Sequence, residues 1–162
     1  MARDISPPVV DSVLSAGWQD FQDVSSRIEV LQSLEGSDIL LAAATIVERT
    51  HNIVRSENLT GEDEVRDDLL VEKAEQGLFQ ALKSSGIVGK LIDGKDYRKA
   101  TEEYARIFSR PLSVFFDEVM VNVDDKDQRK NRMVLLNLIN RVYSEKVADL
   151  SLLQFERGEH IV

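Results

Sequence analysis

The sequence predicts an all-α domain, and three observations lead to this fold class. Apolar residues recur at intervals of three and four along most of the 162 residues. No segment of useful length alternates between apolar and polar residues, as a half-buried strand would. Residues that cap or end helices stand between the apolar segments. We therefore expect a helical bundle of about six to seven helices over residues 1–154, followed by a C-terminal tail, residues 155–162.

Two helices are expected before residue 36. The first begins at Ser6-Pro7-Pro8, because a serine cap with proline in the first turn is typical of a helix start. Gly17 ends it, and Trp18 is expected to pack across the turn. Asp20 caps the second helix, which Gly36 ends. The inward face of this second helix is predicted to carry Phe21, Val24, Ile28, Leu31 and Leu34.

A third helix is expected to begin at Ser37-Asp38. Residues 39–44 are apolar all round, which predicts the central and most buried helix. The second half is polar and carries Arg49, Asn52 and Arg55 at intervals of three. Arginine and asparagine can hold phosphates or read base edges, but a solvated helix face explains the pattern equally well. A loop over residues 58–68 follows.

Residues 68–84 are predicted to form a fourth helix, and residues 87–95 a connector, because they contain two glycines. Asp96 caps a fifth helix, which is expected to break at Pro111, since proline disfavours helix in the residue before it. A short sixth helix follows. The aromatic residues of these two helices are expected to pack in the core: Tyr97, Tyr104, Phe108, Phe115 and Phe116.

The last helix is predicted to begin near Asp124 or Asp125, which serve as caps, and to end near residue 147. The densest basic cluster of the chain stands at its start: Lys126, Arg129, Lys130 and Arg132. Cations at a helix N-terminus oppose the helix dipole, which indicates an anionic partner. From the residues alone, pairing with carboxylates of the fold is the preferred interpretation, and phosphates are the alternative.

Composition excludes several classes of site. The chain has no cysteine, so it holds no disulfide, thiolate nucleophile or cysteine-ligated zinc. Its two histidines, His51 and His160, are too few for a metal cluster. The net charge of −9 excludes a uniformly basic nucleic-acid binder, although residues 97–162 carry no net charge. No apolar run reaches the ~18 residues of a membrane span. We expect a cytoplasmic protein without a metal, membrane or DNA partner.

Three motifs near the C-terminus resemble the β subunit of bacterial-type glycyl-tRNA synthetase. The patterns of that family are P-V-x-x-F-F-D-x-V-M-V-M, R-x-N-R-L-x-L-L and V-A-D-[FL]-S. Residues 111–121, 129–136 and 147–154 match them in the same order. Residues 48–54 resemble the family's K-R-V-x-N-I-L, with Glu48 in place of its lysine.

This resemblance implies the C-terminal anticodon-binding domain of that family, a DALR-like helical bundle similar to the one in arginyl-tRNA synthetase. The implied role is to bind tRNA(Gly) and so support the ATP-dependent attachment of glycine. ATP and magnesium are used by the α subunit of the full enzyme, so this chain is expected to hold no cofactor and to be inactive alone. The implied protein partners are the rest of the β subunit and the α subunit.

The tRNA-binding residues expected on this basis lie in two groups, Arg49, Asn52 and Arg55 in the third helix and Lys126, Arg129, Lys130 and Arg132 in the last. Two alternatives stay open. The chain could instead be a helical module that docks on other proteins of the synthetase. Asn131 and Arg132 could be structural residues that fix the last helix to the bundle.

Overall fold

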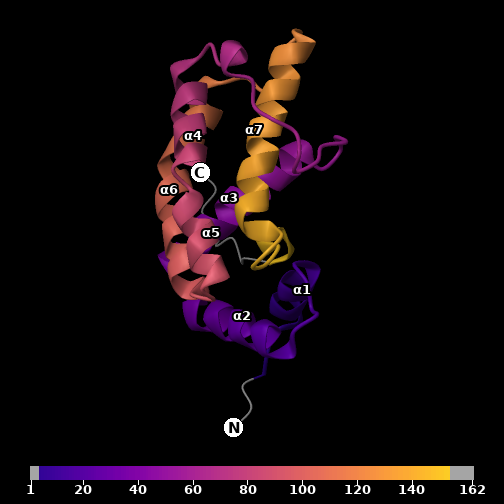
Figure 1. Cartoon of the computed structure of the whole chain (residues 1–162), viewed down its shortest axis with the longest axis vertical. Coiled ribbons are helices and arrows are strands. Elements are labelled where there is room, and N and C mark those ends of the chain that lie inside the picture. Colours follow the sequence, from indigo (N-terminus) through magenta and orange to yellow (C-terminus); the bar gives the residue numbers. More distant parts are fainter. Residues whose placement is uncertain (1–3, 154–162) are drawn as a thin grey trace, which may run out of the picture.

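A computed structural model describes residues 4–153, and in this range the chain forms α-helices, two short 3-10 turns and no strand (Figure 1). The predicted all-α class is confirmed. The predicted tail, residues 155–162, lies outside the described residues. The elements are α1 (Pro7–Ser15), α2 (Phe21–Leu34), α3 (Asp38–Val54), η1 (Asp67–Leu69), α4 (Lys73–Lys83), α5 (Gly86–Asp93), α6 (Tyr97–Glu118), α7 (Lys126–Ser144) and η2 (Leu150–Leu152).

The bundle is built around α3, which packs on both α6 and α7, while α4 and α5 lie along α6. Helices α1 and α2 form one end of the elongated molecule, and the end of α6 and the start of α7 form the other (Figure 1). None of the described helices is long and apolar enough to cross a membrane by itself. Helices α2 and α3 meet those criteria only as a pair, and the pair is bent by 114°.

Capping contacts confirm several predicted helix starts, but the side chain of Ser6 makes no capping bond at α1, and the helix predicted from residue 68 begins only at Lys73. The carboxylate of Asp20 accepts hydrogen bonds from the backbone N–H groups of the second and third residues of α2. The hydroxyl of Ser37 accepts one from the N–H of Leu40 in α3, and Asp125 caps α7 in the same way as Asp20 caps α2. Gly36 has a φ of +76°, which a residue with a Cβ rarely adopts, and this explains the glycine between α2 and α3.

Residues 86–93 form helix α5, so the predicted connector is wrong. Val88 and Ile92 lie one turn apart on α5 and are both buried against the bundle. Burial of this apolar face outweighs the low helix propensity of Gly86 and Gly89, because most helix stability in proteins comes from tertiary packing.

Helix α6 runs unbroken through Pro111, so the predicted break and the separate sixth helix are also wrong. A proline inside a helix removes one backbone hydrogen bond and crowds the preceding turn. Phe108, Leu112 and Phe115 surround this position in sequence and are at most 2% exposed. Their burial against the core holds both halves of α6 in one helix.

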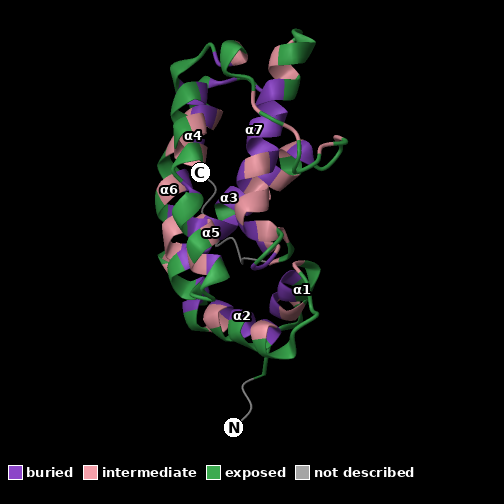
Figure 2. Cartoon of the chain, in the orientation of Figure 1, coloured by how far each residue is buried: buried purple, intermediate pink, exposed green. Residues whose placement is uncertain are grey.

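The core is densest along the middle of α7, where residues 131–137 are all buried (Figure 2). Tyr104 of α6 stacks on Tyr143 of α7 with 5.0 Å between ring centroids, and its hydroxyl donates to the carbonyl of Ile139 at 2.9 Å. Four of the five aromatic residues predicted for the core are buried, and Phe116 is half-buried.

Three apolar residues are more exposed than predicted. Trp18 is 68% exposed and Phe21 84% exposed, so neither packs in the core. Leu41 is 51% exposed, so α3 is central but is not buried on all sides.

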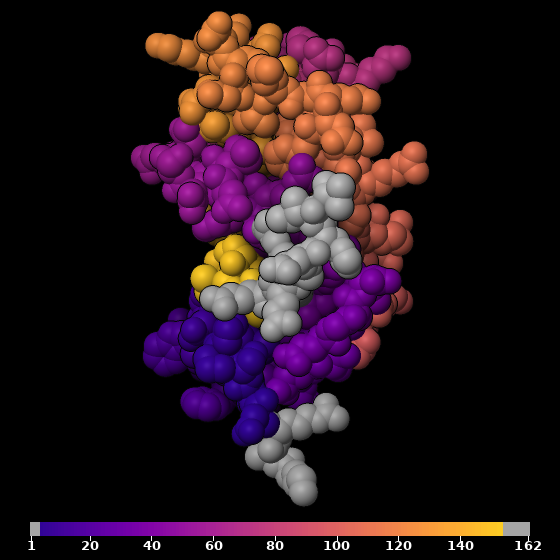
Figure 3. Space-filling model, turned by 180° about the vertical axis from the view of Figure 1, so that it is seen from behind, coloured from indigo at the N-terminus to yellow at the C-terminus, as the bar shows by residue number. Residues whose placement is uncertain are grey.

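Seen from behind, the end of α3, the end of α6 and the start of α7 meet on one face of the molecule (Figure 3). This arrangement places the two groups of predicted tRNA-binding residues on neighbouring elements, although about 70 residues separate them in the sequence.

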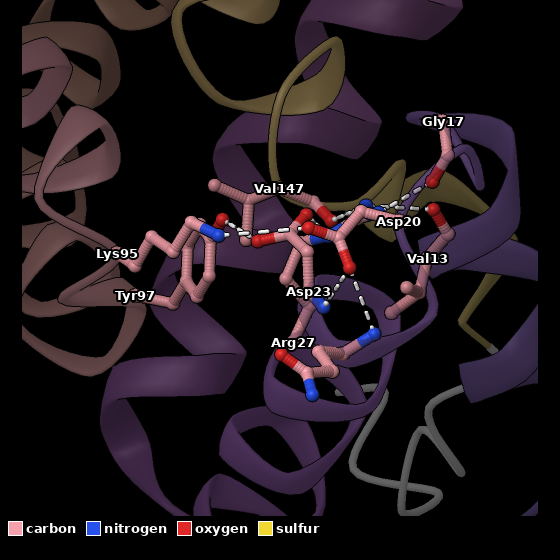
Figure 4. A network of polar contacts seen from close by, with 9 residues as sticks. Val13, Gly17, Asp20, Asp23, Arg27, Lys95, Tyr97 and Val147 are labelled. Atoms are coloured by element: carbon pink, nitrogen blue, oxygen red, sulfur yellow. Dashed lines mark hydrogen bonds and ion pairs between the residues drawn. The ribbon is translucent and has the colours of Figure 1, made fainter.

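Tyr97 links the start of α6 to α2, because its hydroxyl donates a hydrogen bond to the carboxylate of Asp23 (Figure 4). Burial of the ring, together with the hydrogen bond to Asp23 and the negative charge of that carboxylate, raises the pKa of Tyr97 from 10.0 to about 12. The folded state therefore holds this proton more tightly than the unfolded chain does. Tyr97 contributes stability that is fully present below pH 10 and is lost as the pH rises towards 12.

We expect Tyr97→Phe to reduce the loss of stability on the alkaline side. Urea unfolding of the unchanged chain and of the variant, measured at pH 8 and at several values between 10 and 12, gives the comparison. Tyr104 and Tyr143 also have raised pKa values, because both are fully buried, but they are present in both proteins and cancel in the difference. If both proteins lost equal stability between pH 10 and 12, Tyr97 would have no such role.

Candidate nucleic-acid interface

Arg129 joins the two groups of predicted residues. Its guanidinium donates to the carboxylate of Glu57, just after α3, at 2.6 Å, and to the side-chain oxygen of Asn122, just before α7, at 3.1 Å. Arg129 therefore fixes the start of α7 against the end of α3. We call the surface at this junction the three-helix face and define it by Arg49, Asn52, Arg55, Phe116, Lys126 and Arg129.

Arg49 lies over an aromatic ring on the three-helix face. Its guanidinium carbon is 4.2 Å from the centroid of Phe116, a cation–π contact. Phe116 is half-buried and meets Phe115 edge to face, with 5.5 Å between centroids. Arg49 is exposed, so the side of the guanidinium that faces away from Phe116 is open to a ligand.

The contact between Arg49 and Phe116 contradicts the prediction that both Phe115 and Phe116 lie in the core, and one feature of the sequence indicated this. Successive residues of a helix point about 100° apart, so Phe115 and Phe116 cannot both point to the centre of the core. Phe115 is fully buried, and Phe116 lies at the edge, where Arg49 covers it.

Asn52, Arg55 and Lys126 are exposed, and spacings of three along α3 and α7 put them near Arg49 and Arg129 on their helices. Arg55 is the C-cap residue of α3, and Lys126 is the first residue of α7. None of the ion pairs within residues 4–153 involves Arg49, Arg55 or Lys126. The face thus offers cationic donors that carboxylates of the described chain do not neutralise, in contrast to Arg129.

Lys130 lies apart from the three-helix face. It lines a cavity of about 200 Å³ between the start of α7 and the loop after α3. Three carboxylates, those of Asp63, Glu64 and Asp127, line the same cavity. Arg66 lines the cavity as well, and none of the ion pairs within residues 4–153 involves Lys130, so its surroundings are acidic but its tRNA contact stays a prediction.

Arg132 is buried, with 4% of the residue exposed, and forms an ion pair with Glu75, which is fully buried. It also donates to the backbone carbonyl of Met120 at 2.6 Å. The guanidinium of Arg132 is thus turned into the fold, which favours a structural role for this residue, and its contact with tRNA stays a prediction.

Asn131 is also a structural residue. Its side-chain oxygen accepts from the N–H of Arg66 at 2.7 Å, and its amide donates to the carbonyl of Arg66 at 3.0 Å. Together with the Arg132–Glu75 pair, this contact agrees with the alternative in which the two residues fix the last helix to the bundle.

The chemistry of the three-helix face is that of binding. Its guanidinium, ammonium and amide groups donate to phosphate oxygens and to base edges, and an arginine plane accepts a stacked base. No group of three acidic or histidine side chains in the described part of the chain could hold a metal ion. His51 is half-buried on α3, and His160 lies outside the described residues.

Comparison with known proteins agrees with this chemistry. Residues 44–154 match the family model of the DALR anticodon binding domain. The chain is 38% identical over 152 residues to the glycine–tRNA ligase beta subunit of Acidobacterium capsulatum, a match that covers 88% of the chain and 21% of that protein. The corresponding subunit of Desulforamulus reducens is 36% identical over 150 residues, with 92% and 21% covered.

The glycine–tRNA ligase beta subunit of Coxiella burnetii (strain RSA 331) is 32% identical over 155 residues, which covers 94% of the chain and 22% of that protein. The chain thus spans about a fifth of the length of the curated relatives that it matches.

Proposed function

Because the chain belongs to the DALR anticodon binding domain family, we propose that it is the tRNA-binding domain of a glycine–tRNA ligase β subunit and binds the anticodon loop of tRNA(Gly) on its three-helix face. The observation that carries this proposal is the Arg129–Glu57 contact, which brings the cations of two distant segments to one face within the matched residues. The relatives supply the identity of the enzyme, and the face supplies the place of contact.

The geometry suits a single-stranded loop. Bases of such a loop are splayed out and can stack on aromatic rings and arginine planes. Arg49, supported from below by Phe116, offers such a plane. Asn52 stands one turn further along α3, where its amide can hydrogen-bond a base edge. Arg55 and Lys126, which form no ion pair within residues 4–153, would be contacts for phosphates, while Arg129 would share its charge between Glu57 and the RNA.

The net charge of −9 is compatible with this role, because a local patch of cations is sufficient for a loop of few nucleotides. The acidic remainder of the surface would repel RNA that is not aligned with the patch and so add to specificity.

The remaining parts of the proposal concern the complete enzyme. The chain would act in the cytoplasm, beside the rest of the β subunit and the α subunit. Adenylation of glycine, with ATP and magnesium, would take place on the α subunit, so this chain would contribute tRNA binding and no chemical step.

We expect the chain to bind a tRNA(Gly) anticodon stem-loop more tightly than the same stem-loop with a changed anticodon. Fluorescence anisotropy titrations at several salt concentrations measure both affinities. The affinity should fall with rising salt, with a slope of about 0.7 for each phosphate contact to single-stranded RNA. Equal affinity for the two stem-loops, or an affinity that does not change with salt concentration, would contradict anticodon recognition by this chain.

Charge reversal locates the contact. Arg49→Glu with Arg55→Glu should weaken binding of the stem-loop about tenfold or more and lower the salt slope. Lys90→Glu with Lys99→Glu is the matched control, because both lysines are exposed on other elements, α5 and the start of α6. If both pairs of changes weakened binding equally, attraction by overall charge would explain it, and the three-helix face would not be the site.

A further inference from the structure

An apolar groove lies between α1 and α2, at the opposite end of the molecule from the start of α7 (Figure 1). Its volume is about 560 Å³. We call it the α1–α2 groove; it is lined by Asp11, Leu14, Ser15, Trp18, Phe21 and Val24. Of these, Leu14 is 39% exposed, Trp18 68% and Phe21 84%.

Exposed aromatic rings of this size are unusual on a protein surface. Single exposed apolar residues are common, but neighbouring ones that line a groove mark a site of interaction. Tryptophan and phenylalanine at the centre of interfaces supply much of their binding energy, because each ring removes a large apolar area from water. Since Trp18 and Phe21 are the exposed aromatic residues of the turn between α1 and α2, the α1–α2 groove has the composition of an interface core.

The groove belongs to a part of the chain that the relatives share and the family model does not cover. The model matches residues 44–154, which begin inside α3. The match to the Coxiella burnetii β subunit covers 94% of the chain, so it leaves about ten residues unmatched and must include all of α2. The stretch that forms α2 therefore has a counterpart in these β subunits, although it lies outside the residues that the family model matches.

The relatives also indicate what can cover the groove. The chain spans only about a fifth of their length, so about four-fifths of a β subunit lies outside it. The groove lies at the opposite end of the molecule from the start of α7 (Figure 1), so a partner bound there leaves that part of the three-helix face free. Asp11 adds a negative charge to the groove, whereas the nearby Asp20 is paired with Lys95 at 3.7 Å. A complementary partner would present apolar side chains with a basic one opposite Asp11.

We propose that the α1–α2 groove is the surface on which this domain docks to the rest of the glycine–tRNA ligase β subunit, with Trp18 and Phe21 as its central contacts. The inference rests on the proposed function for the identity of the partner. Docking through α1 and α2 would also hold the segment after α7, because Arg27 of α2 donates to the carbonyl of Val147 and the N–H of Asp149 donates to the carbonyl of Ser12 in α1. The three-helix face is thereby held at a set distance from the body of the enzyme.

The single tryptophan of the chain allows a direct test. The chain is labelled with 5-fluorotryptophan, and its one fluorine resonance is followed while a β subunit of Acidobacterium capsulatum that lacks the matching stretch is added. We expect the resonance to shift and to lose its sensitivity to replacement of H2O by D2O, as Trp18 leaves the solvent. The Coxiella burnetii subunit, shortened in the same way, serves as a second partner, so that poor folding of one partner does not decide the result.

Phe21→Ser should weaken this docking about tenfold or more, because it removes a central aromatic contact. Leu41→Ser is the matched control, an exposed apolar residue on α3 away from the groove, and should leave docking unchanged. Both variants should bind the anticodon stem-loop as the unchanged chain does. Loss of stem-loop recognition with docking intact would therefore refute the proposed function alone.

Three results would overturn the docking proposal. The first is an unshifted resonance with both folded partners. The second is a resonance that is already shielded in the chain alone, or becomes so as its concentration rises, since the groove would then be covered by the chain itself or by a second copy. The third is a shift on addition of the stem-loop without any partner, which would assign the groove to RNA.

Discussion

Replacing Arg27 by methionine is expected to lower the free energy of unfolding by about 3–5 kcal/mol, the range for breaking a buried charge network. Arg27 is 3% exposed, and its guanidinium donates in four directions (Figure 4). It bonds the carboxylate of Asp23 at 3.0 Å, the carbonyls of Val13 and Val147 at 2.9 Å each, and the carbonyl of Gly17.

These bonds explain the size of the effect. Val13 lies in α1, Gly17 in the turn after it, and Val147 beyond the end of α7, so one side chain joins three segments. Methionine fills a similar volume but donates no hydrogen bond. The change would remove the Arg27 donor from the buried carbonyl of Val147 and leave Asp23 without its cation, and such groups cost more than the bond itself contributes.

Urea unfolding followed by far-UV circular dichroism measures the change. Arg27→Lys should retain only a small part of the stability that Arg27 contributes, because an ammonium group cannot bond several carbonyls from one rigid plane. Arg106→Met is the matched control: Arg106 is 68% exposed in its pair with Glu103, and the loss of such a pair costs about 1 kcal/mol or less. If Arg27→Met cost no more than Arg106→Met, the network would not hold this end of the molecule together.

The sequence predicted the features of this fold that depend on neighbouring residues. The caps Asp20, Ser37 and Asp125 act within three residues of their own position, so their roles could be read locally. The two errors in the middle of the chain came from glycine and proline. Local propensity argues against helix at Gly89 and Pro111, but burial of Val88, Ile92 and Leu112 decides the outcome.

The buried charges were partly visible in the sequence. Arg27 stands three residues after Val24 and four before Leu31, on the same buried stripe of α2, and a charge in that position indicates a buried partner. The identity of the partner was not visible. Val147 is 120 residues away, and only the packing of the whole bundle brings it to Arg27.

In the candidate site, too, the sequence indicated the residue types but not their arrangement in space. The residue types of Arg49, Asn52, Arg55 and Lys126 could be recognised as donors for RNA, and these residues are exposed. That they share one face depends on the contact between Arg129 and Glu57, 72 residues apart. Exposure could not be deduced from residue type either, since Arg129 and Arg132 belong to one short motif but only Arg132 is buried.

The second large effect is expected for the ion pair between Arg132 and Glu75. Arg132→Met should lower the free energy of unfolding by about 3–5 kcal/mol, because it leaves a fully buried carboxylate without its cation. Glu75 also accepts from the N–H groups of Val71 and Glu72 at 2.9 and 3.2 Å, so the start of α4 depends on the same side chain.

A double variant separates the charge of this pair from its packing. Glu75→Gln keeps an oxygen that can accept from Val71 and Glu72, and combined with Arg132→Met it removes both charges. We expect the double variant to be more stable than Arg132→Met alone, since a buried ion pair replaced by neutral groups of similar size is often as stable as the original. A double variant as unstable as the sum of the two single changes would refute this account.

The same variants decide between the two interpretations of Arg132. If Arg132 is structural, the folded double variant should bind the anticodon stem-loop with the affinity of the unchanged chain, because no RNA donor has been removed. Arg49→Glu with Arg55→Glu should lose affinity while remaining folded. If the double variant folded but no longer bound the stem-loop, Arg132 would be a tRNA-binding residue. The buried ion pair would then have to open when RNA binds.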